Sequence, residues 1–170
     1  MPRALVSYVR YISWFSTRAG KIMEYGIFVM LAIMLIETVL RTIFNSPTEW
    51  SIELGKYVLG TYFTIGSAYI LLCERHVRMD ALYSRWSAKR RATFDLATFF
   101  TGIVFLIVLL RSSIDAALFS LKFSQHSQTA WAAPLSPIRI IFVVGISLLL
   151  LQMIALFIRD LSVVRGKPIQ

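Results

Sequence analysis

Two carboxylates and an arginine near the first two apolar segments could form ion pairs within a membrane. Glu37 and Arg41 stand four residues apart, so on a helix they share one face and can pair. Glu53, with Lys56 three residues later, stands at the start of the next apolar segment. Because charged side chains in apolar segments cost free energy, they mark functional hypotheses. We predict a Glu37–Arg41–Glu53 cluster that clamps two helices and faces a partner subunit; the alternative is ordinary snorkelling of these side chains toward water.

Residues that could bind a metal or perform catalysis are few. Cys73 and His76 are three residues apart, but two such residues do not make a metal site, and we expect Cys73 to be a small buried thiol. The sequence holds no Ser–His–Asp arrangement, no glycine-rich phosphate loop and no histidine within an apolar segment that could bind haem. We therefore predict no catalytic residue, no metal and no cofactor, and expect that the protein is not an enzyme.

Four apolar segments must position these residues. Hydrophobic residues make up 57% of the 170-residue chain, and most of them fall in segments close to the ~20 residues with which a helix crosses a bilayer. In lipid, every backbone amide must be paired internally, which favours helices. We predict one all-α membrane domain over 1–170 with four transmembrane helices. They span about 22–44, 54–73, 92–110 and 138–158.

The net charge of +9 is distributed in a pattern that predicts topology. Lysine and arginine gather before the first apolar segment, between the second and third, and after the fourth. By contrast, 45–53 has none and 112–137 has only Lys122. Because cytoplasmic loops collect basic residues, we predict that both termini are cytoplasmic and that the protein lies in an inner membrane. The basic segments suit anionic phospholipid headgroups, and we expect no nucleic-acid partner.

The first twenty residues have the pattern of an amphipathic helix. Apolar residues recur there at helical spacing, and arginines are available for another face. We predict a basic helix over 1–20 that lies on the cytoplasmic leaflet; a disordered basic tail is the alternative. The residues of the predicted apolar face are Leu5, Val9, Ile12, Phe15 and Ala19.

A stripe of small residues runs along the second apolar segment. Gly60, Thr64 and Ala68 recur every four residues, and such stripes let helices approach closely. We predict that this face packs on another helix, of this chain or of a partner.

Three motifs together resemble the small membrane subunit (DctQ component) of TRAP, or tripartite ATP-independent periplasmic, transporters. Arg41 ends the first segment and is followed by a W-x-x-E motif formed by Trp50 and Glu53. An H-V-R-M-D motif, from His76 to Asp80, follows the second segment. A stretch with Trp131 and two prolines, T-A-W-A-A-P-L-S-P-I-R, leads into the fourth. The resemblance covers about residues 22–160.

The resemblance implies an accessory role in solute uptake. In that family a periplasmic substrate-binding protein delivers an organic acid to a large membrane subunit, which moves it by an elevator-like motion coupled to sodium entry. The small subunit packs on the scaffold of the large one, and sodium is expected at the large subunit. The resemblance further implies that Trp50 anchors a helix end, that Arg41 and Glu53 bridge helices or reach the large subunit, and that His76 and Asp80 order the cytoplasmic loop. For the last pair, a solvated helix end is the alternative.

Two other classes of function are left open by the residues. A stand-alone oligomeric channel or exporter would need a polar face through the membrane, and the apolar segments lack one. A membrane-bound enzyme subunit or cofactor carrier would bind a chromophore or a metal.

Overall fold

The computed structural model describes residues 3–73 and 88–164, and its regular elements within those ranges are α-helices. This confirms the all-α prediction for the described part of the chain. The helices are α1 (Arg3–Glu24), α2 (Gly26–Thr42), α3 (Glu49–Leu72), α5 (Ala88–Lys122) and α6 (Ser136–Val164).

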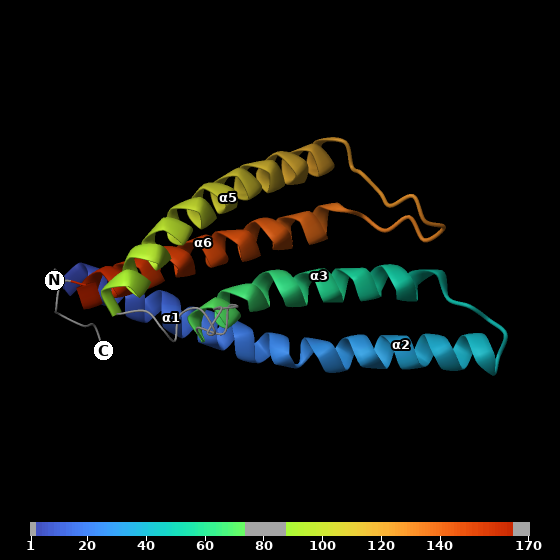
Figure 1. The fold of residues 1–170 in the computed structure, drawn as a ribbon. Coiled ribbons are helices and arrows are strands. Elements are labelled where there is room, and N and C mark those ends of the chain that lie inside the picture. The colour runs from blue at the N-terminus through green and yellow to red at the C-terminus, as the bar shows by residue number, and fades with distance from the viewer. Residues whose placement is uncertain (1–2, 74–87, 165–170) are drawn as a thin grey trace.

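The helices form an elongated bundle with two distinct ends (Figure 1). The α2–α3 and α5–α6 connections lie at one end, which we call the loop end. The start of α1 and the end of α6 lie at the opposite end, which we call the terminal end. The most extensive helix pairings are α3 with α6 and α5 with α6, and α3 also packs on α1 and α2. Helices α3 and α6 therefore form the centre of the bundle, while α2 and α5 lie on its outside.

Helices α1 and α2 are separated by a single residue, Tyr25. Its backbone N–H donates to the carbonyl of Ile22 at 3.2 Å, and its own carbonyl accepts from Phe28 and Val29, so the helical hydrogen bonding is almost unbroken. The apolar run Val6–Thr42 has 37 residues, about 55 Å at 1.5 Å per residue. That exceeds the ~30 Å hydrocarbon core of a bilayer. Only part of this run can therefore cross a membrane.

The predicted N-terminal helix is present, and it packs against the bundle. Val9 and Ile12 are buried around Ala155 of α6. The hydroxyl of Ser16 donates to Oε1 of Gln152 at 2.9 Å. Phe15, expected on the apolar face, is instead 46% exposed. The buried face instead continues from Ile12 to Ser16 and Gly20. A location of this helix on the cytoplasmic leaflet stays a prediction.

Three helical runs among the described residues are long and apolar enough to cross a membrane: Val6–Thr42, Phe99–Lys122 and Ser136–Arg159. The helix that holds the third predicted segment, 92–110, extends beyond it, because α5 continues without a break to Lys122. Helix α3 is not among these runs; its sequence includes Lys56 and several hydroxyl and glycine residues. Four transmembrane helices therefore stay a prediction.

The α5–α6 connection is a closed turn that folds back on itself. Two residues after the end of α5, Ser124 lies in the left-handed region (φ 43°), and the N–H of Gln125 donates to the carbonyl of Ser120, as in a Schellman motif. Farther along, Ser127 N–H donates to the Ala133 carbonyl at 2.8 Å, and Leu135 N–H to the Gln125 carbonyl at 3.0 Å. These backbone bonds fix the shape of the connection at the loop end.

Candidate functional site

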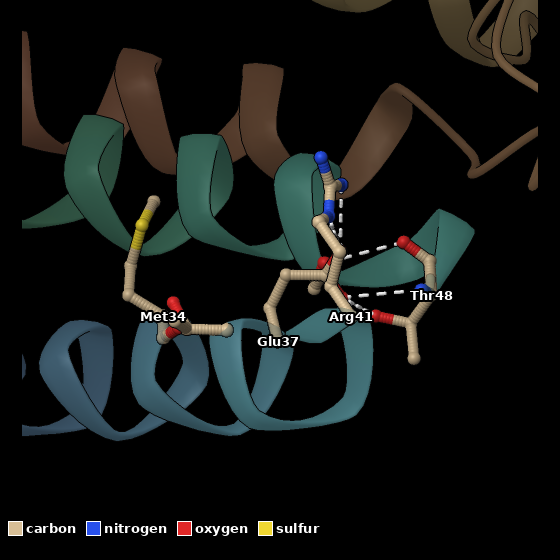
Figure 2. Close-up of polar contacts among 6 residues, drawn as sticks. Met34, Glu37, Arg41 and Thr48 are labelled. Carbon is tan, nitrogen blue, oxygen red and sulfur yellow. Dashed lines mark hydrogen bonds and ion pairs between the residues drawn. The ribbon is translucent and has the colours of Figure 1, made fainter. Parts of the chain in front are cut away.

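Glu37 ties α2 to the start of α3 at the loop end (Figure 2). Its carboxylate accepts from Arg41 Nη2 at 2.8 Å and from Arg41 Nε at 3.1 Å. Its other oxygen accepts from the backbone N–H of Thr48 at 3.2 Å and from the Thr48 hydroxyl. The pairing of Glu37 with Arg41 agrees with their four-residue spacing. Because Thr48 caps the start of α3, the same carboxylate fixes the α2–α3 connection.

Glu53 forms a second contact that joins α3 to the α5–α6 connection. The hydroxyl of Thr129 donates to its Oε2 at 2.6 Å, and the Ser127 hydroxyl lies 3.3 Å from that of Thr129. Only 3% of Glu53 is exposed. A shielded carboxylate requires such donors, since a buried charge without partners is costly. Glu53 therefore holds the α5–α6 connection over the start of α3.

These contacts divide the predicted Glu37–Arg41–Glu53 cluster into two. Arg41 bonds Glu37, whereas Glu53 bonds the hydroxyl of Thr129, 76 residues later in the sequence. Serine and threonine are common loop residues, so no signal in the sequence distinguished Thr129 as the partner of Glu53. Only the closed shape of the α5–α6 connection brings them together.

Two further side chains fix the same connection. The hydroxyl of Tyr57, one turn after Glu53, donates to the carbonyl of Pro134 at 3.0 Å. Arg139 Nη1 donates to Oε1 of Gln125 at 2.7 Å and to the carbonyl of Ala116 at 2.9 Å. The α5–α6 connection is thus bonded to α3, α5 and α6. It presents a preformed surface at the loop end.

The remaining predicted site residues fall in different places. Trp50 is half-buried in the first turn of α3, and Trp131 is exposed on the α5–α6 connection. His76 and Asp80 lie outside the described residues. Cys73 is exposed rather than buried, because it follows the last residue of α3 and extends past the packed part of that helix.

The stripe of small residues on α3 packs on α6 of the same chain. A side chain added at Gly60 would meet the Phe142 ring at 3.0 Å, and one at Gly145 would meet Thr64 Cγ2 at 2.5 Å. Ala68 is fully buried. The stripe therefore lets α3 and α6 approach closely, and Gly145 is the complementary small residue on α6.

The interior offers little for a hydrophilic solute. A cavity of about 250 Å³ lies between α1, α3 and α6, and its exposed lining is apolar although Arg18 borders it. Among the described residues, no group of three histidine, cysteine or acidic side chains could hold a metal ion. The helix hydroxyls are used locally: Thr61 and Thr64 each donate to the carbonyl four residues earlier.

One pair of charged residues within an apolar run was not among the predicted site residues. Asp115 fell in the predicted connection 112–137 and Arg111 directly after the predicted segment 92–110, but both lie on α5 inside the run Phe99–Lys122. Both are exposed. Their four-residue spacing is the same signal that pointed to Glu37 and Arg41. It was missed because the apolar segment was ended at Leu110.

Comparison with known families decides the class of this protein. The family model of the DctQ component of tripartite ATP-independent periplasmic transporters matches residues 30–163, from the middle of α2 to the end of α6. The chain belongs to the DctQ family. No curated protein and no solved structure matches the chain.

Membership of the DctQ family places the chain among small components of TRAP transporters. The family and the apolar helices together support a membrane location. A tripartite transporter has other components, so the family implies association with them. The family match begins within α2 and so leaves α1 outside it.

Proposed function

We propose that this DctQ protein is an accessory subunit that packs on the scaffold of the large membrane subunit of its transporter. In this proposal the complex takes up an organic acid, delivered by a periplasmic substrate-binding protein, with sodium entry as the driving force. The solute and the sodium bind at the large subunit, and this chain enlarges the static part of the complex. The protein lies in the bacterial inner membrane.

The observation that carries the proposal is the contrast between the interior and the outer faces of the bundle. The described cavity between α1, α3 and α6 has no polar lining surface. The outer helices α2 and α5 instead leave large apolar side chains exposed, among them Phe28, Leu35, Phe100 and Phe105. Extended apolar faces suit contacts with lipid and with another membrane subunit. The described residues therefore provide surfaces for packing, and the cavity among them is not lined to bind a hydrophilic solute.

The proposal includes four membrane crossings with both termini in the cytoplasm. The terminal end holds both the start of α1 and the end of α6 (Figure 1), so an even number of crossings is needed. Although α3 is not among the three runs that are long and apolar enough to cross a membrane, its hydroxyls bond its own backbone, which removes much of their cost in lipid. The basic residues of α1 fit the cytoplasmic side.

Reconstitution into liposomes tests this function. We expect sodium-driven uptake of the solute only when this chain, the large subunit and the loaded binding protein are all present. Liposomes that contain this chain alone should show no flux. Flux through the chain alone would contradict the proposal and would favour a stand-alone channel or exporter.

A further inference from the structure

The outward face of α5 carries two charges inside an apolar run that is long enough to cross a membrane. Helices α5 and α6 run antiparallel and in contact along their length: Phe99 stacks on Phe157 at 4.3 Å near one end, and the hydroxyls of Ser120 and Ser136 are 3.2 Å apart near the other. Arg111 lies near the middle of the run Phe99–Lys122. This register places it opposite the middle of the run Ser136–Arg159, the most apolar of the three.

Arg111 and Asp115 belong to a regular stripe of exposed residues. Val104, Val108, Arg111, Asp115 and Leu118 are all exposed and follow one another at alternating spacings of four and three. We call this stripe the outer seam of α5. Such spacing is typical of a helix face that packs along another helix. The opposite face of α5 already packs on α6: its residues Leu106, Ala117 and Ser120 are buried.

Lipid alone is a poor environment for this seam. Charged residues in membrane helices almost always face protein or water, because an ionised group at the bilayer centre is costly. Among the described residues, neither Arg111 nor Asp115 makes an ion pair. Aspartate has a short side chain and cannot reach the interface as lysine and arginine can.

We propose that the outer seam of α5 docks a transmembrane helix of the large subunit, which presents an acidic side chain to Arg111 and a hydrogen-bond donor to Asp115. This inference rests on the proposed function and identifies the face that meets the partner. A second copy of this chain fits less well. In a twofold dimer about the membrane normal, residues at equal depth face each other, so Arg111 would oppose Arg111.

Photo-crosslinking in native membranes tests the docking. A photoreactive phenylalanine analogue replaces Val108 in the full chain, expressed with its own large subunit. We expect a single protein adduct with the mass of this chain plus the large subunit. An adduct of two copies of this chain, or labelling of lipid only, would overturn the proposal.

A charge-removal pair tests the chemistry of the docking. In Arg111→Gln the partner's acidic side chain loses its counter-charge. We therefore expect the amount of large subunit recovered with the tagged chain to fall about tenfold or more. Arg10→Gln removes the same charge from an exposed position of α1 and should leave recovery unchanged. Equal recovery with both variants would refute the docking of α5.

The two experiments also separate this inference from the function on which it rests. If the wild-type chain recovers no large subunit, the proposed function itself fails. If the wild-type chain recovers it, and Val108 gives no adduct with it, only the assignment of the interface to α5 fails.

Discussion

The close approach of α3 and α6 predicts that alanine at position 145 destabilises the bundle. A Cβ on Gly145 would lie 2.5 Å from Thr64 Cγ2 and 3.1 Å from the backbone carbonyl carbon of Thr64. Carbon atoms pack at about 3.5–4.0 Å, so the side chain of Thr64 must move by about 1 Å. Rotation of that side chain does not solve the clash. It would break the 2.7 Å hydrogen bond from the Thr64 hydroxyl to the Gly60 carbonyl, and the backbone contact would remain.

The cost follows from the geometry of this contact. Overpacking of this kind costs about 1–3 kcal/mol, against which a helical Gly→Ala change gains at most about 1 kcal/mol in helix propensity. Gly66→Ala is the matched control, because a Cβ there meets nothing within 4 Å. The propensity gain is shared by the two variants. Their difference in unfolding free energy should therefore be the overpacking cost.

Thermal unfolding in a mild detergent is the assay. At about 2–4 °C for each kcal/mol in a chain of this length, Gly145→Ala should melt about 2–12 °C below Gly66→Ala. The double variant Gly145→Ala with Thr64→Ser removes the methyl group that clashes and should recover part of the loss. Equal melting temperatures for the two alanine variants would refute the close packing of α3 on α6.

Two further predictions concern the loop end and the topology. Glu53→Ala should lower both the melting temperature and the yield of assembled transporter without changing solute preference, because the α5–α6 connection loses its anchor. Glu49→Ala, at an exposed position of the same helix, should change neither the melting temperature nor the yield. A normal yield of Glu53→Ala with altered solute preference would contradict this role. In intact spheroplasts of a Cys73→Ser strain, a membrane-impermeant maleimide should label Gln128→Cys on the α5–α6 connection and spare Ser7→Cys on α1, both at exposed positions. The reverse pattern would place the termini outside the cell.

The helices could be predicted from the sequence, and their limits could not. Apolar runs of sufficient length indicated the main helices, because lipid leaves a chain few other structures. A division between an N-terminal helix over 1–20 and a first apolar segment from residue 22 was predicted; it lies at Tyr25, where the hydrogen bonding is nearly that of a continuous helix. The third predicted apolar segment stopped at Leu110, directly before Arg111. The structure shows that the helix continues through the charges to Lys122.

The candidate site could be predicted only where its contacts are local. Glu37 and Arg41 are one helical turn apart, so spacing alone predicted their pairing. Glu53 bonds Thr129 across 76 positions in the sequence, a contact that depends on the closed α5–α6 connection. The stripe on α3 was recognised by its spacing, but its partner Gly145 is a single glycine with no spacing pattern of its own. Long-range polar contacts thus required the structure.

The central claim is that this DctQ protein functions as one subunit of a larger membrane complex. Its most direct test is purification of the tagged chain from its native membranes in a gentle detergent, followed by mass measurement of the intact complex and of its parts. Our account predicts one copy of this chain with one copy of a large polytopic permease. Recovery of the chain alone, or as an oligomer of itself, would contradict the account.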